Sequence, residues 1–175
     1  DLVFAMRMRD TAFKRVLATM PIGTAVEIDG PYGSFVLHAD PLRHAVFLAG
    51  GIGITPFRSM ILHASHNNLS HKIFLLYSNY RREVSAFLEE LESMQKSNPN
   101  YTFIATMTGA KKSSQAWEGE AGYIDRKMLE KYLDSLVGPV YYIAGPPGFV
   151  LAMRGALQES GVDSRDVKFD QFVGY

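Results

Sequence analysis

The fold is decided by residues 45–56, which read Ala45-Val46-Phe47-Leu48-Ala49-Gly50-Gly51-Ile52-Gly53-Ile54-Thr55-Pro56. The apolar residues that come first predict a buried strand over 45–49. The glycines that follow predict a tight turn. Pro56 then marks the first turn of a helix, where a proline is favoured because its missing N–H would have no helical partner there. A strand, a glycine turn and a helix in this order are typical of a parallel α/β sheet.

The chain after residue 39 repeats this alternation of strand and helix. Continuous apolar runs predict further strands over 73–77, 101–107, 140–144 and 167–172. Helical spacing predicts helices over 56–65, 83–95, 125–136 and 147–160, with Asp125 as an N-cap and Gly161 as a C-cap signal. Strands without polar alternation are expected when helices cover both faces of a sheet. We therefore predict a doubly wound, Rossmann-like parallel sheet of about five strands over residues 39–175.

Residues 1–38 have a different character. A strand is expected over 2–6, a helix over 11–20 and a strand over 25–28, which ends at Gly30-Pro31-Tyr32-Gly33. These elements are too few to enclose a core, so we predict that they are the C-terminal remnant of an antiparallel β-barrel. The chain also opens on Asp1, without an initiator methionine. We expect it to be a piece of a longer protein.

Composition excludes several functions. The 175 residues carry 18 basic and 18 acidic side chains, and this balance disfavours a nucleic-acid partner. Because there is no cysteine, zinc–thiolate sites, cysteine-ligated clusters and thiol nucleophiles are excluded within these residues. No apolar run approaches the roughly 20 residues that span a bilayer. A cysteine-free chain fits a reducing compartment, and we expect a cytoplasmic protein.

Two glycine-rich turns carry the chemistry. Gly50, Gly51 and Gly53 precede a helix, so that the backbone and the helix amides can approach a pyrophosphate closely. The alternative is an ordinary glycine-rich turn, because Pro56 stands where the dinucleotide fingerprint has its third glycine. A second turn, Ala144-Gly145-Pro146-Pro147-Gly148, follows the strand over 140–144. Neighbouring strands would bring both turns to the point where the sheet reverses its winding, which favours the nucleotide site.

An ordered set of motifs resembles the ferredoxin–NADP reductase family. The set spans essentially the whole chain and consists of Gly30-Pro31-Tyr32-Gly33-Ser34-Phe35, residues 50–57, Leu76-Tyr77-Ser78-Asn79, residues 142–147 and Phe172-Val173-Gly174-Tyr175. The resemblance implies a flavin-binding barrel next to an α/β nucleotide domain. It also implies an NAD(P)H-dependent oxidoreductase that moves a hydride between nicotinamide and FAD and passes electrons to an acceptor protein or domain.

The resemblance also implies roles for individual residues. Thr55 corresponds to the position at the nicotinamide ribose, Asp170 to a family glutamate near the nicotinamide, and Tyr175 to the aromatic ending against the flavin; these three are the catalytic candidates. The remaining candidates are cofactor-binding. They are the dinucleotide contacts Gly50, Gly51, Gly53, Pro56, Ser78, Asn79, Arg81, Gly145, Pro146 and Pro147, and the flavin contacts Thr11, Phe13 and Phe172.

Two departures from the family pattern keep a second hypothesis open. Ala144 stands where the family often has a cysteine, and the flavin signature of an arginine, an aromatic residue two positions on and a serine or threonine is absent. FAD binding is therefore expected to require the rest of the barrel. The alternative to an oxidoreductase is a nucleotide-binding or regulatory module that lacks flavin.

Two further groups of side chains each permit two interpretations. Arg81 and Arg82 either lie in a solvated helix entrance or read the ribose phosphate of NADP; no acid follows Tyr77, and Lys111 and Lys112 would help. His63, His66 and His71 either bind a metal or lie at a solvated helix end. The second interpretation is favoured because no carboxylate or cysteine stands near enough in sequence to complete a metal site.

Overall fold

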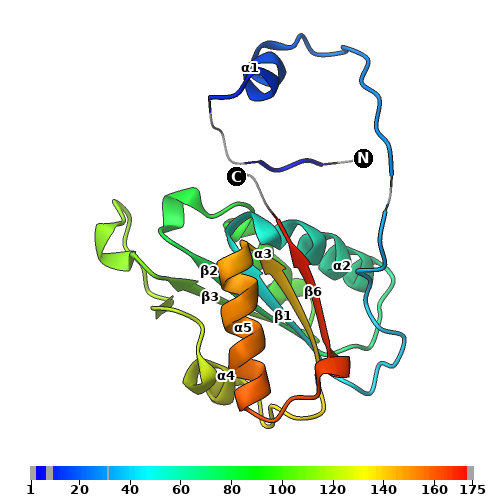
Figure 1. Cartoon of the computed structure of the whole chain (residues 1–175), viewed down its shortest axis with the longest axis vertical. Helices are drawn as coiled ribbons and strands as arrows, with labels where there is room; N and C mark the ends of the chain where they lie inside the picture. Colours follow the sequence, from blue (N-terminus) through cyan, green and yellow to red (C-terminus); the bar gives the residue numbers. More distant parts are fainter. Residues whose placement is uncertain (1–2, 7–9, 31, 173–175) are drawn as a thin grey trace.

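The computed structural model describes residues 3–6, 10–30 and 32–172, and its centre is one parallel sheet (Figure 1). The strands lie in the order β4-β3-β2-β1-β5-β6, and every neighbouring pair is parallel. Their bounds are Ala45–Gly50 (β1), Ile73–Asn79 (β2), Tyr101–Met107 (β3), Glu120–Ala121 (β4), Val140–Gly145 (β5) and Val167–Gln171 (β6). The predicted doubly wound α/β class is confirmed. The short strand β4 was not predicted, since two residues form no apolar run.

Helices cover both faces of the sheet. The helices α2 (Ile54–His66) and α3 (Leu88–Ser97) share one buried cluster with alternate residues of β1, among them Ala45, Phe47 and Ala49. The helices α4 (Arg126–Tyr132) and α5 (Pro147–Glu159) pack on the opposite face, against Val46 and Leu48. Double coverage explains why all six residues of β1 are buried.

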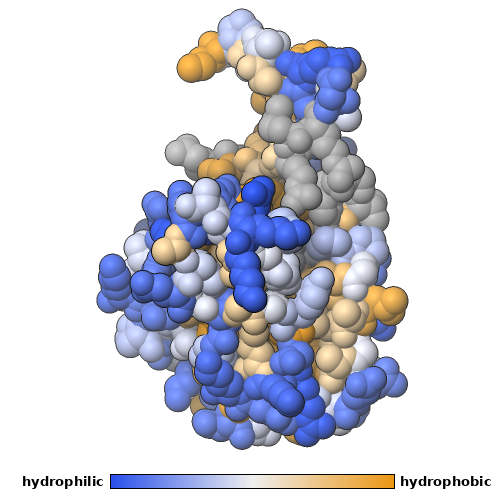
Figure 2. Space-filling model, turned by 90° about the vertical axis from the view of Figure 1, so that its left-hand side faces the viewer, coloured by the Kyte–Doolittle hydropathy of each residue, from blue (hydrophilic) through white to orange (hydrophobic). Residues whose placement is uncertain are grey.

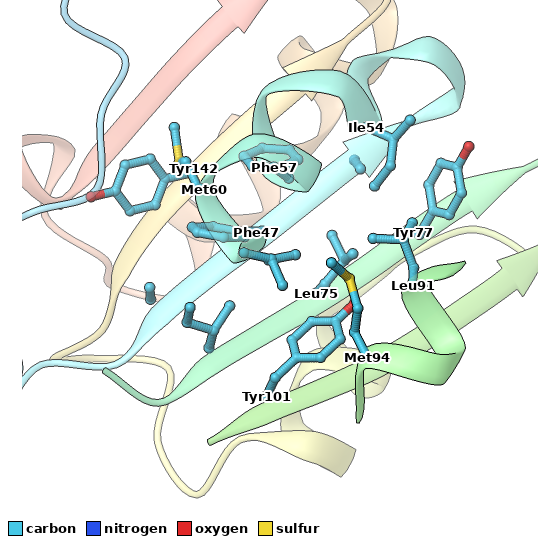
Figure 3. Packing of buried hydrophobic residues seen from close by; sticks show 14 of the residues in the cluster. Phe47, Ile54, Phe57, Met60, Leu75, Tyr77, Leu91, Met94, Tyr101 and Tyr142 are labelled. Carbon is cyan, nitrogen blue, oxygen red and sulfur yellow. The ribbon is translucent and has the colours of Figure 1, made fainter. Parts of the chain in front are cut away.

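Aromatic rings fill much of the core under α2 (Figure 3). The rings of Phe47 and Phe57 stack with centroids 4.8 Å apart, and Tyr142 meets Phe47 edge-on at 5.2 Å. Phe35, from the segment that leads into the sheet, contacts Phe57 at 5.8 Å and Tyr142 at 5.7 Å. Phe35 and Leu37 thereby pack against the core of the sheet domain, and this contact holds the N-terminal segment against β5 and α2.

The winding reverses between β1 and β5. From β1 the chain adds β2, β3 and β4 on one side, and it returns to add β5 and β6 on the other. Residues 45–49 pair with residues 140–144, so that both strands end at the same level. Ligands of open α/β sheets bind at such a reversal, beyond the carboxyl ends of the strands.

Two helices differ from their predicted bounds by more than two residues at one end. The helix expected over 83–95 begins only at Leu88, because Phe87 adopts a left-handed conformation with φ 59° and residues 82–84 form a separate 3₁₀ turn. The helix expected over 125–136 ends at Tyr132, although Leu133 and Leu136 remain buried. Asp125 is its N-cap as predicted, and its side chain accepts a hydrogen bond from Met128 N.

In the N-terminal part, the described residues form the helix α1 (Ala12–Thr19), with Thr11 as its N-cap. The strands expected over 2–6 and 25–28 do not form within the described residues, since no neighbouring strand is present there to pair with either. Large apolar side chains are exposed along this segment, including Phe4, Phe13 and Ile22. Figure 2 shows both hydrophobic and strongly hydrophilic surface on the segment that projects above the sheet domain.

Among the described residues, no helix is both long and apolar enough to cross a membrane.

Candidate functional site

The two glycine turns cross in direct contact. A methyl group on Gly53 would lie 2.1 Å from the carbonyl oxygen of Ala144 and 2.6 Å from the nitrogen of Gly145. A methyl group on Gly145 would lie 3.0 Å from the carbonyl oxygen of Gly50. On Gly50 itself, a methyl group would lie 2.8 Å from the ring of Phe149. Glycine is therefore required at Gly53 and Gly145 by the close approach of the turn after β1 to the turn after β5, and at Gly50 by the Phe149 ring.

A cavity of about 410 Å³ opens next to this crossing. Its floor includes Gly50 and Gly51, and Ser78 and Asn79 line it at the end of β2. Its other walls come from Tyr80, Thr108, Tyr123, Ile124, Pro146, Gly148, Phe149, Ala152 and Met153. Gly51 has φ 52°, a left-handed conformation that glycine adopts without strain, and a methyl group there would meet no atom within 4 Å. The turn therefore presents bare backbone to the cavity.

The cavity is lined by Gly51, in the 3₁₀ turn that leads into α2, and by Pro146 and Gly148 at the N-terminus of α5. Helix α2 follows the 3₁₀ turn Gly51–Gly53, and helix α5 begins at Pro147 with Pro146 as its N-cap. Pro146 and Pro147 have no N–H, so the amides that α5 offers to an anion begin at Gly148, and the positive end of the helix dipole favours an anion there. The geometry suits a pyrophosphate.

Thr55 and Pro56, the predicted site residues at the start of α2, lie in different surroundings. Thr55 is half-buried in the first turn, where its hydroxyl donates a hydrogen bond to the carbonyl of Ile52 at 3.3 Å. Pro56 faces away from the crossing and lines a separate cavity between α2 and residues 35–39. Neither side chain lines the cavity at the glycine turns.

The end of β2 carries the predicted ribose-recognition residues. Ser78 pairs in register with Gly50, which brings it to the glycine turn. The Arg81 guanidinium lies 5.6 Å from the ring centre of Tyr80, and its buried Nε has no hydrogen-bond partner among the described residues. Arg81 thus stands beside the cavity, behind the Tyr80 ring that lines it.

A second cavity, of about 700 Å³, lies on the other side of β5. It is lined by residues 32–35 and by residues 167–170 of β6, including Asp170. Asp170 is exposed and pairs in register with Ala144. The backbone N–H of Phe172 donates to the carbonyl of Gly145 at 3.0 Å, and its side chain packs against the core cluster under α2. The sheet therefore places Asp170 next to the strand end that carries Ala144 and Gly145.

The structure does not bring the flavin candidates together among the described residues. Thr11 and Phe13 belong to α1 and its N-cap, a helix that buries no residue, and Phe13 is 66% exposed. Phe172 lies at the end of β6 on the sheet domain. Tyr175, a catalytic candidate, lies outside the described residues.

Three aromatic residues around the cavity were missed by the sequence analysis. Tyr80, Tyr123 and Phe149 all line it. Each stands next to a feature that the sequence does show: Tyr80 after the β2 motif, Tyr123 after Gly122, and Phe149 after Gly148. The sequence signal that could have identified them is an aromatic residue next to a predicted turn.

The three histidines that were considered as metal ligands lie in two different environments. His71 is buried, not solvated as predicted, and its Nε2 lies 2.9 Å from the carbonyl oxygen of His38. His63 and His66 are exposed near the end of α2. The described residues contain no group of three or more histidine, aspartate or glutamate side chains that could hold a metal ion.

Fold and site together define a doubly wound nucleotide-binding domain. The family model of the oxidoreductase NAD-binding domain matches residues 47–155. The chain therefore belongs to the oxidoreductase NAD-binding domain family, and its resemblance to ferredoxin–NADP reductases is confirmed.

Relatives and solved structures agree with this assignment. The chain is 30% identical over 156 residues to the F subunit of the Na⁺-translocating NADH-quinone reductase of Actinobacillus succinogenes, a match that covers 87% of this chain and 38% of that protein. It is 28% identical to the phenol hydroxylase P5 protein of Acinetobacter pittii over 152 residues, 86% of this chain and 42% of that one. The fold is similar to a ferredoxin NADP⁺ reductase of Neisseria gonorrhoeae solved with FAD and NADP, with a TM-score of 0.75, 18% identity and coverage of 94% and 71%. The chain thus spans less than half of these two curated relatives.

Proposed function

We propose that this chain is the nicotinamide-dinucleotide-binding domain of an NAD(P)H-dependent flavoprotein oxidoreductase, with its boundary to the flavin barrel near residue 38. The contact between the two glycine turns at the winding reversal carries the proposal, because it builds a cavity lined by the bare backbone of Gly50 and Gly51 and by the N-terminus of α5. The name of the quinone reductase relative and the bound NADP of the Neisseria structure support it.

The residues of the chain bind and orient the dinucleotide in this proposal. Residues 50–53 and the start of α5 receive the pyrophosphate. Tyr80, Tyr123 and Phe149 offer ring faces to the adenosine half. Thr55 and Asp170 flank the nicotinamide half. The bound nicotinamide supplies the hydride; the protein supplies position and electrostatics.

The end of β2 favours a coenzyme with a ribose phosphate. Neither Ser78 nor Asn79 is acidic, and Arg81 stands behind Tyr80 with an Nε that has no partner among the described residues. An acid at this place would bind the ribose hydroxyls of NAD and repel a phosphate. We expect NADP⁺ to bind at least as well as NAD⁺.

Flavin binding requires residues beyond those described. Thr11 is the N-cap of α1 and Phe13 lies within it, and this helix has no buried residue. Phe172 belongs to a different part of the structure, the end of β6. The described residues do not by themselves form a flavin site. We expect this chain to be colourless on purification. A longer protein that contains the flavin barrel would be yellow and would pass electrons to an acceptor protein or domain.

Isothermal titration of the purified chain with NADP⁺ and NAD⁺ tests the binding proposal. Heat from at least one nucleotide, lost when Gly53 is replaced, supports it. No heat from either nucleotide with a folded sample contradicts it. The absence of the flavin arginine motif favours a second candidate, a nucleotide-binding module without redox activity. If a protein with the barrel neither binds FAD nor reduces dyes with NAD(P)H, the second candidate replaces the oxidoreductase.

A further inference from the structure

One carboxylate fastens the loop that follows β3. Glu83 lies in the 3₁₀ turn after β2, and its Oε1 accepts four hydrogen bonds from residues 113–115. The donors are Ser113 Oγ at 2.7 Å, Ser114 N at 2.5 Å, Ser114 Oγ at 2.6 Å and Gln115 N at 3.2 Å. These bonds, that of the Ser114 side chain foremost, lower the pKa of Glu83 to about 2. The carboxylate is therefore ionised at neutral pH.

The near end of the same loop is fastened to β2. Thr108 N–H donates to the carbonyl of Asn79 at 2.8 Å, and Gly109 N–H donates to that of Tyr80 at 2.8 Å. Gly109 lies against the Tyr80 ring, since a methyl group on it would come within 2.5 Å of a ring carbon. Residues 108–115 are thus held at both ends, with Lys111 and Lys112 between the two attachments (the loop lies beyond the ends of β2 and β3 in Figure 1).

This arrangement places two cations on one aromatic ring. The Lys112 Nζ lies 5.8 Å and the Arg81 guanidinium 5.6 Å from the ring centre of Tyr80. Among the described residues, neither cation forms an ion pair with a carboxylate. Tyr80 lines the cavity at the glycine turns. Two such cations next to a ligand cavity suit a phosphate group.

We propose that Glu83 is a positioning residue for coenzyme selection: by holding residues 113–115 it keeps Lys112 at the Tyr80 ring that Arg81 also contacts, so that both cations meet a phosphate on the adenosine ribose. The inference rests on the proposed function of the cavity. Glu83 acts through the loop and makes no contact with the coenzyme.

If Glu83 holds the loop, its replacement changes the affinity for NADP⁺ in the direction opposite to that expected from charge repulsion alone. Glu83 is an anion near a site for an anion, so removal of its charge would by Coulomb repulsion alone strengthen NADP⁺ binding. If Glu83 holds the loop, the same change releases Lys112 and weakens NADP⁺ binding. The direction in which the Kd of NADP⁺ changes therefore distinguishes the two effects.

The experiment compares Glu83→Gln and Glu83→Ala with Glu89→Gln in the full chain. Glu89 is a matched control, because its side chain is 87% exposed and lies 3.9 Å from Arg82, so that its replacement removes the same charge nearby without touching the loop. Titration calorimetry uses NADP⁺, NAD⁺ and 2′,5′-ADP. We expect Glu83→Gln to raise the Kd of NADP⁺ and of 2′,5′-ADP about tenfold, the equivalent of one weakened charge-assisted hydrogen bond, with the Kd of NAD⁺ nearly unchanged.

Limited trypsin digestion reports on the loop without any nucleotide. Cleavage after Lys111 and Lys112 should accelerate in both Glu83 variants and stay at the wild-type rate in Glu89→Gln, at equal melting temperature. Unchanged cleavage overturns the role of Glu83 in holding the loop. Tighter or equal NADP⁺ binding in Glu83→Gln overturns the inference and leaves the proposed function standing. Failure of the folded wild-type chain to bind either dinucleotide overturns both.

Discussion

Replacement of Gly53 by alanine tests the contact on which the site is built. The added methyl group would lie 2.1 Å from Ala144 O and 2.4 Å from Ala144 C. Carbon and oxygen atoms in favourable contact stay about 3.3 Å apart or more, so the two turns would have to separate by more than about 1 Å. Both facing atoms belong to the backbone of a central strand, and no change of side-chain rotamer relieves the overlap.

Two opposing effects set the size of the loss. Gly53 has φ −61° and ψ −1°, which alanine adopts without strain, so the change by itself favours the folded state by about 0.4–1 kcal/mol. Overpacking of a rigid contact costs about 1–3 kcal/mol and sometimes more, and here the facing atoms are backbone. We expect a net loss of about 2 kcal/mol or more in the free energy of unfolding, and a Kd for the dinucleotide at least about tenfold higher.

Urea unfolding followed by circular dichroism measures the stability, and titration calorimetry measures the affinity. Gly155→Ala in α5 is the matched control, since a methyl group there meets no atom within 4 Å and should stabilise the helix by up to about 1 kcal/mol. If Gly53→Ala retains both stability and affinity within about 0.5 kcal/mol, the close approach of the turns is not what builds the site.

Further predictions concern Arg81, Tyr142 and His38. Arg81→Ala should raise the Kd of NADP⁺ about tenfold or more and leave that of NAD⁺ unchanged, because only NADP⁺ offers a phosphate; equal losses by calorimetry would show that Arg81 does not read it. Tyr142→Phe removes the hydroxyl that accepts a hydrogen bond from the backbone N–H of His38 at 2.7 Å. The free energy of unfolding in urea should fall by about 1–3 kcal/mol, and an unchanged midpoint would contradict the role of this bond. Burial in the folded state lowers the pKa of His38 below its ordinary value of 6.5, so the unfolded state binds more protons. The free energy of unfolding should therefore fall as the pH drops below about 6.5. His38→Gln should flatten this part of the profile of stability against pH, and a profile identical to that of the wild type would refute the prediction.

The sequence alone predicted those elements whose signals are local. Continuous apolar runs predicted β1, β2, β3 and β5, because a strand covered on both faces needs no polar alternation. The edge strand β6 was also predicted, although its residues alternate with polar ones and its last three are exposed. Side chains that cap a helix act within three residues, and Thr11 and Asp125 accordingly lie at the starts of α1 and α4. Gly161, with φ 81°, follows the end of α5 as predicted.

Errors arose where a distant partner decides the conformation. Residues 25–28 alternate like a strand, yet the described residues give them no strand to pair with. Residues 83–87 have helical spacing, but Glu83 bonds to residues about 30 positions away and Phe87 turns left-handed, so that α3 begins only at Leu88. Strand β4 exists because it pairs with Thr106 and Met107, and two residues carry no periodicity of their own.

By itself the sequence determined the class of fold, the two glycine turns and the kind of ligand that such turns accept. Only the tertiary structure decided that Gly53 lies against Ala144 and Gly145, that Tyr80, Tyr123 and Phe149 converge on one cavity, and that Glu83 holds the loop carrying Lys112. The physical reason is the range over which each signal acts. Backbone preference and periodicity are set within a few residues, whereas a cavity wall or a fastened loop depends on chain segments that meet only after the strands have paired.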